Sequence, residues 1–485
     1  MARKNRFRLP TVTEAMPVTN PRAAGIDVGS RMHAVAIPAH LSAEPCRTFG
    51  CTTPDLQEMA AWLCSVGITT VAMESTGNYW VQPLRILEAA GLHVILVHPE
   101  YARQAKRTKY SDLDDSLWLQ QMHAYGLLPA SFLPPALFQR LRTLWRHREK
   151  LIGLQASCLQ RIQNTLELMN VQLHKAVTDI SGLTGLRIIR AIVAGEHNPA
   201  QLALYRDPHI HCSFDDLVKA LTGDYREEEL FVLRQLLAGY DFYQQQLDAC
   251  DAEVDAFPHT VAASLPPPVP DEPAPPPVPA EPAPPAPVPA VPARGKASVR
   301  PASALRKRPS KHEPTRYDWH ALLTKLCGVD ATRICGLSVL LVLAIIAEIG
   351  TDLTPWESVK RFTAWLGLAP DHRVSGGKVL KRHTRRGKPH AAHPFYVAAL
   401  AAAKSQTPLG EFFRYQKARI GGAKALTATA RKIAELYYSL LTYGPDFVEH
   451  GQQVLQHQSQ ERKRRKLARL ARELGVTIVE PAVAA

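Results

Sequence analysis

The chain has 485 residues, which is enough for about three domains with sizeable cores. Lys and Arg number 58 against 44 Asp and Glu, and the net charge of +14 favours a polyanionic partner, with nucleic acid ahead of an anionic membrane surface. Apolar runs such as residues 337–349 are too short to span a bilayer, and the basic N-terminus lacks the apolar stretch of a secretory signal. We therefore expect no membrane segment and a bacterial-type cytoplasmic protein.

The eight cysteines are scattered along the chain and form no CxxC pair, so we expect reduced thiols. His209, His211 and Cys212 come nearest to a metal-ligand cluster, but no second half follows at the spacing of a zinc site. This segment is therefore expected to be an ordinary loop.

Residues 1–21 form a basic extension, and residues 22–134 alternate between strand-like and helix-like stretches. The sequences AAGIDVGSRMHAVAIPA and EPCRTFGCTT predict a hairpin. Further strands are predicted at ITTVAMEST and HVILVHP, and helices at residues 54–66, around 81–90 and about 112–125. This order predicts an α/β domain.

Residues 135–257 have a helical pattern. Apolar residues recur there at spacings of three and four, at Leu151, Leu154, Cys158, Ile162, Leu166 and Met169. The pattern predicts a long antiparallel helical pair or a coiled-coil arm, and periodicity alone does not separate the two.

A proline-rich segment, residues 258–316, divides the chain. Within it, residues 258–309 hold 18 of the 39 prolines, which exclude helix and sheet and favour an extended polyproline-like spacer. Residues 317–449 are mainly helical, with a loop predicted at APDHRVSGGKVLKRHTRRGKPH. The last region, residues 450–485, contains the basic helix ERKRRKLARLAREL, which either is a solvated helix face or follows a phosphate backbone.

Four acids are the most informative residues. Asp27 lies between Ile26 and Val28 in the first strand, where a carboxylate is costly unless it is paired or bound to metal. Glu74 repeats this situation in a second strand of the same predicted sheet. Asp112 and Asp115 are three residues apart, so they share one face of a helix from which Asp114 points about 100° away.

Converging carboxylates repel one another, and Mg²⁺ or Mn²⁺ is the simple way to hold them together. The chemistry expected of such a site is phosphoryl transfer on a nucleic-acid backbone. Each acid taken singly could instead be a helix cap, a turn residue or a salt-bridge partner, but the four in this order favour the metal site.

Three motifs, GIDVGS, VAMESTGNYW and KYSDLDDSLWLQQMHAYGLLPASFLPP, resemble the DEDD-type transposases of the one-ten family of insertion sequences, relatives of the Piv invertase. Beyond the proline-rich segment, GLSVLLVLAIIAEIG and FTAWLGLAPDHRVSGGK resemble the second signature domain of that family. The likeness covers nearly the whole chain except the N-terminal extension and the proline-rich segment.

The resemblance implies an α/β RuvC-like (RNase H-like) domain at residues 22–134, a helical coiled-coil arm and a mainly α, serine-bearing C-terminal domain. It implies that Asp27, Glu74, Asp112 and Asp115 are the catalytic and metal-binding tetrad. Ser375 would be the nucleophile that forms a transient phosphoserine bond with DNA. Donor and target DNA, a guide or bridge RNA, and dimers paired into tetramers are the implied partners.

The residues themselves support Ser375 as part of a phosphate site, because it precedes two glycines in a cation-rich loop, although an ordinary turn would look similar. The basic residues expected to contact nucleic acid are Lys106, Arg107, Lys109, Lys378, Lys381, Arg382, Arg385, Arg386 and Lys388.

Three other functions remain open at the level of sequence. GIDVGS also suits the phosphate-binding turn of an actin-like ATPase or sugar kinase, but a second glycine-rich phosphate turn is missing. A RuvC-like junction resolvase or nuclease would need neither Ser375 nor the helical arm. A non-catalytic nucleic-acid-binding protein would leave the four acids unexplained.

Overall fold

The computed structural model describes residues 17–99, 112–257, 318–376, 378–384 and 389–476. The chain divides into two compact units, Met1–Leu133 and Pro134–Ala485. The proline-rich segment lies outside the described residues, and so do six of the basic candidates: Lys106, Arg107, Lys109, Arg385, Arg386 and Lys388.

Unit 1 contains a five-stranded sheet with the strand order β3-β2-β1-β4-β5. Its strands are β1 (Ala23–Val28), β2 (Met32–Ala36), β3 (Cys46–Gly50), β4 (Thr70–Glu74) and β5 (His93–Val97). Strand β2 runs antiparallel to both of its neighbours, β1 and β3, whereas β4 runs parallel to both β1 and β5. The predicted α/β domain is confirmed, and this mixed sheet is consistent with a RuvC-like fold.

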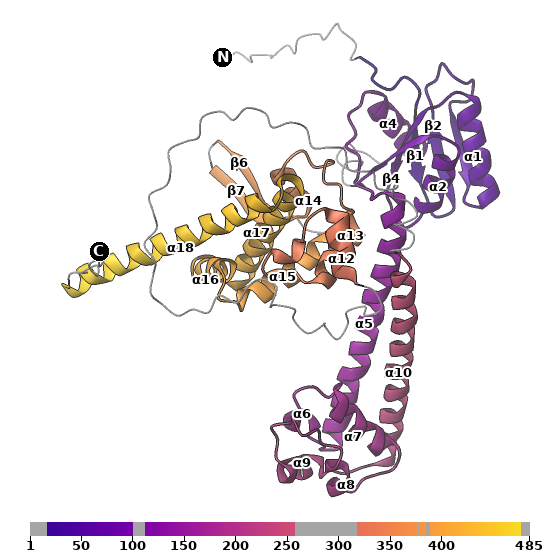
Figure 1. Cartoon of the computed structure of the whole chain (residues 1–485). Coiled ribbons are helices and arrows are strands. Elements are labelled where there is room, and N and C mark those ends of the chain that lie inside the picture. The colour runs from indigo at the N-terminus through magenta and orange to yellow at the C-terminus, as the bar shows by residue number, and fades with distance from the viewer. Residues whose placement is uncertain (1–16, 100–111, 258–317, 377, 385–388, 477–485) are drawn as a thin grey trace, which may run out of the picture. The chain divides into compact units, whose positions relative to one another are not determined.

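Helices cover both faces of the sheet (Figure 1). Alternate residues of β1 point to opposite faces, and Ile26 belongs to the core shared with α1 (Thr53–Ser65) and α2 (Val81–Ala89). The other face packs against α4 (Asp112–Ala124). The approach is close: a Cβ added to Gly25 would lie 2.3 Å from the backbone nitrogen of Gln120.

In unit 2, α5 (Ala136–Leu168) and α10 (Glu227–Asp255) lie side by side (Figure 1). The two helices are antiparallel. Arg148 in α5 pairs with Asp251 in α10, and Gln155, further along α5, donates at 2.9 Å to Gln244, which lies earlier in α10. The antiparallel helical pair predicted from periodicity therefore forms within one chain.

A small helical head joins the far ends of α5 and α10. Its core is built from the facing apolar sides of α6 (Leu173–Ala176), α7 (Leu183–Val193), α8 (Pro199–Ala203) and α9 (Phe214–Leu221). His209 lies here, with Nδ1 2.9 Å from Asp207 Oδ1. It therefore belongs to a local turn, as expected for an ordinary loop.

The C-terminal part of unit 2 is a helical domain. Its helices are α12 (Trp319–Cys327), α13 (Val339–Ile349), α14 (Val359–Trp365), α15 (His393–Ala403), α16 (Pro408–Ile420), α17 (Gly422–Tyr443) and α18 (Pro445–Leu474), with short 3-10 turns at Ala331–Arg333 and His390–Ala392. The apolar helix α13 packs on α5, where buried Glu348 meets Arg142 and Arg146.

The segment predicted as a loop around Ser375 forms a hairpin, so that prediction was wrong. Strands β6 (Pro370–Ser375) and β7 (Lys378–Thr384) pair antiparallel. The reason is local: Gly376 takes a positive φ of 54°, a conformation that favours glycine and allows a tight reversal between two strands. Over the described ranges, no helix is both long and apolar enough to cross a membrane.

Candidate active site

Asp27 and Glu74 lie on neighbouring parallel strands at the same level. The register pairs Ile26 of β1 with Met73 of β4, so the next residue of each strand is one of the two acids. Both strands end at this edge of the sheet, because Val28 closes β1 and Glu74 closes β4. Ligand-binding residues of parallel sheets gather at such carboxyl ends.

The two acids also share a face of the sheet. Asp27 follows Gly25 by two residues, and Gly25 faces α4. Glu74 follows Thr70 by four residues, and the Thr70 hydroxyl lies 2.8 Å from Nε2 of His123 on α4. Both carboxylates therefore lie on the side of the sheet that α4 covers.

Helix α4 brings two more acids to this face. Ser116 and Gln120 are buried against the sheet, and Asp112 stands one turn before Ser116 on the same stripe. Asp115 stands one turn before the buried Leu119 and is itself half-buried. Asp112 and Asp115 therefore belong to the first turn of α4, on its sheet-facing side.

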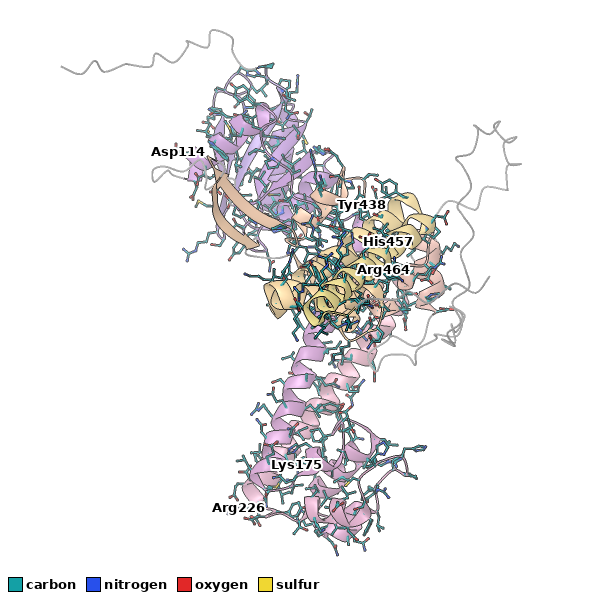
Figure 2. All side chains as sticks on the ribbon, turned by 90° about the vertical axis from the view of Figure 1, so that its left-hand side faces the viewer. Asp114, Lys175, Arg226, Tyr438, His457 and Arg464 are labelled. Carbon is teal, nitrogen blue, oxygen red and sulfur yellow. The ribbon has the colours of Figure 1, made fainter. Side chains whose placement is uncertain are left out.

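Exposure alone does not separate Asp114 from the tetrad, because Asp112 is exposed too and, of the acids on α4, only Asp115 is half-buried. Asp114 is exposed, at the rim of unit 1 (Figure 2). Burial raises the pKa of the Cys46 thiol on β3, and the Asp114 carboxylate raises it further. By the helical period, Asp114 lies on the side of α4 opposite the buried Ser116.

Glu74 is the most buried of the acids, with 9% of its surface exposed. The Thr76 hydroxyl donates to its Oε1 at 2.8 Å. The residue between them is fixed as well, because the Ser75 amide donates to the Val97 carbonyl at 3.0 Å and the Ser75 hydroxyl donates to it at 3.1 Å. The turn after β4 therefore holds the Glu74 carboxylate at the strand end.

The donor set suits a hard divalent cation. Asp27, Glu74, Asp112 and Asp115 offer only carboxylate oxygens, the ligands that Mg²⁺ and Mn²⁺ prefer. They come from three elements on one face and at one edge. Within the described ranges, no three His, Cys, Asp or Glu side chains are gathered closely enough to hold a metal ion. The acids share a location but do not form a closed coordination group.

Ser375 ends β6, directly opposite Lys378, the first residue of β7. Further along the hairpin, Arg373 pairs with Lys381 and His372 pairs with Arg382. Backbone pairing thus places the serine at the turn of a hairpin with a basic residue at several register positions. Such a turn can present a hydroxyl to a phosphate.

Comparison with protein families gives two matches. Residues 24–171 match the DEDD transposase model of the IS110 group, described as "Transposase". Residues 331–414 match the model described as "Transposase IS116/IS110/IS902 family". The chain belongs to the IS110 family of transposases.

The two matched stretches contain every acid of the candidate site and the Ser375 hairpin. This IS110-family chain is therefore a DNA transposase or recombinase, and DNA is its substrate. DEDD transposase domains generally use a divalent metal. No curated protein matches the chain. The actin-like ATPase, sugar kinase and non-catalytic interpretations are set aside by these matches.

Sequence reasoning missed two features of the site. The hairpin carrying Ser375 was signalled by two glycines between two chain segments that each contain β-favouring residues. Thr76 was signalled only by its position two residues after Glu74, from which a threonine hydroxyl can reach back to a carboxylate.

Proposed function

We propose that this transposase cuts and rejoins DNA with a Mg²⁺-bound set of four acids and a serine nucleophile. The register of β1 and β4 is the observation that carries the proposal, because it brings Asp27 and Glu74 to one level, one edge and one face. Two half-buried or buried carboxylates at adjacent positions repel each other in the absence of a cation. A divalent ion relieves that repulsion.

The four acids have distinct parts in this proposal. Asp27 and Glu74 supply ligands from the rigid sheet, and Asp112 and Asp115 supply them from the first turn of α4. When bound, Mg²⁺ polarises the phosphate and stabilises the charge that develops on the leaving oxygen. Thr76 holds one Glu74 oxygen by a hydrogen bond and thereby leaves the other oriented for a ligand.

Ser375 attacks the phosphorus in this proposal. A bond forms between its Oγ and phosphorus, the bond from phosphorus to the departing DNA oxygen breaks, and that oxygen leaves as a hydroxyl by taking up the proton that Oγ loses. A free serine hydroxyl is a weak nucleophile and needs a base or a metal to take up or weaken its proton. Lys378, Lys381 and Arg382 on β7 would neutralise the phosphate that it attacks.

A guide RNA and an assembly of two or four copies complete the proposal. Both are expectations that the resemblance to the family raises, and the net charge of +14 suits a protein that binds two kinds of nucleic acid. Sequencing of RNA that co-purifies with the protein tests the first. One structured RNA species should dominate, whereas a random sample of cellular RNA would refute guidance.

A water-using nuclease of the junction-resolvase type is the nearest alternative chemistry. It would use the same four acids but would leave no covalent link between protein and DNA. Labelled DNA on a denaturing gel separates the two, because only the serine pathway yields a DNA-linked protein.

The carboxylate site is tested by substitution with a built-in control. Asp27→Ala, Glu74→Ala, Asp112→Ala and Asp115→Ala should each abolish Mg²⁺-dependent strand cleavage without unfolding unit 1. Asp114→Ala should cleave normally, since Asp114 lies in the same turn but on the side of α4 opposite the buried Ser116. Normal cleavage by Asp115→Ala together with loss in Asp114→Ala would show that the register of α4 is assigned wrongly.

A further inference from the structure

The last helix of the chain is not used by the proposed chemistry. Helix α18 begins beyond both family-matched stretches, the second of which ends at residue 414. Between residues 462 and 472 it carries seven Lys or Arg residues. Most of these side chains are exposed, for example Lys463, Arg465 and Arg469 with 68%, 81% and 71% of their surfaces accessible.

The basic residues of α18 are ordered by the helix period. Arg462, Arg465, Lys466, Arg469 and Arg472 are spaced i, i+3, i+4, i+7 and i+10, so they occupy about one third of the helix circumference. We call these five residues the basic face of α18. Leu467, Leu470 and Leu474 lie outside this face, and so do Lys463 and Arg464. Five of the seven basic residues therefore share one face.

Contacts with α16 hold the start of the basic face in place. The Arg462 guanidinium lies 4.4 Å from the centre of the Tyr415 ring, and Arg419 lies 5.9 Å from the same ring. Lys463 Nζ lies 2.7 Å from Oε1 of Glu411, which is 28% exposed. Two independent contacts thus fix α18 on α16, and Arg419 adds a cation on that helix.

The remaining ion pairs of the basic face are weak. Arg465 pairs with Glu461 at 3.5 Å and Arg469 pairs with Glu473 at 3.4 Å, and all four side chains are exposed. Exposed pairs of this kind are weak in water and yield readily to a polyanion. The guanidinium groups are thus available to a polyanion.

The dimensions of the basic face fit a nucleic-acid strand. Residues 462–472 advance along the helix by about 15 Å at 1.5 Å per residue. One strand of duplex DNA presents a phosphate about every 3.4 Å along its axis, so about four phosphates span the same length. The face has five cations and no Asn or Gln suited to reading bases.

We propose that the basic face of α18, anchored at Tyr415, binds the phosphate backbone of duplex DNA without reading its sequence. It holds DNA without using the carboxylates or Ser375. The inference does not rest on the proposed chemistry, because backbone binding needs neither metal nor cleavage. DNA binding measured in EDTA therefore tests it under conditions in which metal-dependent cleavage does not occur.

The test compares two triple variants of the full-length protein. Arg465→Gln, Lys466→Gln and Arg469→Gln together remove three charges from the basic face. The matched control, Lys219→Gln, Arg226→Gln and Arg234→Gln, removes the same charge from exposed positions of α9, α10 and the loop between them. Figure 2 labels Arg226. Duplex DNA of unrelated sequence is titrated by fluorescence anisotropy between 50 and 200 mM salt.

Three phosphate contacts contribute about 2.7 to the slope of log K against log salt. Raising the salt from 50 to 200 mM should therefore weaken DNA binding by the α18 variant about 40-fold less than it weakens binding by wild type. The control variant should keep the wild-type slope. Equal slopes in all three proteins, or equal flattening in both variants, would overturn the proposal. Far-ultraviolet circular dichroism verifies that the exposed substitutions leave the helices intact.

The anchor and the choice of partner are tested in the same assay. Tyr415→Leu should weaken DNA binding about as much as loss of one phosphate contact, while Tyr415→Phe keeps the ring and should behave as wild type. If the α18 variant changed binding to duplex RNA or to anionic phospholipid vesicles but left the DNA slope unchanged, the assignment to DNA would be wrong.

Discussion

The Thr76 hydroxyl donates a 2.8 Å hydrogen bond to Oε1 of Glu74, the most buried acid of the candidate site. The bond spans only two residues, so it forms as soon as the turn after β4 closes. A carboxylate that must bind metal benefits from such a fixed orientation, because less side-chain freedom is lost on binding.

Thr76→Val should therefore raise the Mg²⁺ concentration needed for half-maximal cleavage. Hydrogen bonds to charged groups contribute about 1.5–3 kcal/mol, so we expect an increase of about tenfold or more. Thr76→Ser keeps the hydroxyl and should retain the wild-type requirement. The Mg²⁺ dependence of thermal unfolding gives a readout independent of activity. An unchanged Mg²⁺ requirement in the valine variant would remove Thr76 from the site.

Glu348 should be important for attachment of the C-terminal helical domain to α5. It is 6% exposed, and Arg146 binds it through Nε at 2.6 Å and Nη2 at 2.8 Å, while Arg142 Nε lies at 3.1 Å. Glu348→Ala leaves two partly buried guanidinium groups close together, and we expect a loss of roughly 2–4 kcal/mol in the free energy of unfolding.

The pair Arg140–Glu253 provides the control for Glu348. It lies at 3.4 Å, but both of its side chains are about 60% exposed. Glu253→Ala should therefore change the unfolding free energy by less than about 1 kcal/mol in urea titrations. Similar losses in the two variants would show that burial of the Glu348 cluster has no special role.

Unit 1 should lose stability as the pH falls from about 6.5 to 4. Burial, with a smaller contribution from His93, lowers the pKa of His123 to about 4. The unfolded chain binds a proton at the ordinary pKa of 6.5 and the folded chain does not, so stability is complete above pH 6.5 and declines below it. Burial lowers the pKa of His33 as well, which adds to the effect.

His123→Gln should flatten this pH dependence, because glutamine can still bond to the Thr70 hydroxyl but does not titrate. The exposed His40→Gln should leave it unchanged. Urea unfolding of the two variants and wild type at pH 7 and pH 5 measures the difference. If the unfolding free energy of His123→Gln still fell steeply between pH 7 and pH 5, groups other than His123 would be responsible.

The sequence predicted those parts of the fold that depend on local pattern. Apolar residues such as Val71 and Met73 identified β4, and the spacing of Asp112 and Asp115 identified one face of α4. The level at which Asp27 and Glu74 meet was not predictable, because parallel register depends on the packing of residues about fifty positions apart.

Two other features were hidden for physical reasons. In the Ser375 hairpin, basic residues such as Lys381 and Arg382 obscure the alternation that normally identifies strands. Glu348 was visible only as an interruption of an apolar run, since its partners Arg142 and Arg146 precede it by about two hundred residues. Long-range charge pairing of this kind has no signal in a single sequence.

We propose above all that Ser375 attacks DNA with the help of metal held by the four acids. The most direct measurement is a denaturing gel of end-labelled DNA bearing the element's ends, incubated in Mg²⁺ with the protein and its co-purifying RNA. Wild type and Asp114→Ala should give a DNA-linked protein band. Ser375→Ala, Asp115→Ala and wild type in EDTA should give none. A covalent band that persists in Ser375→Ala would contradict the account.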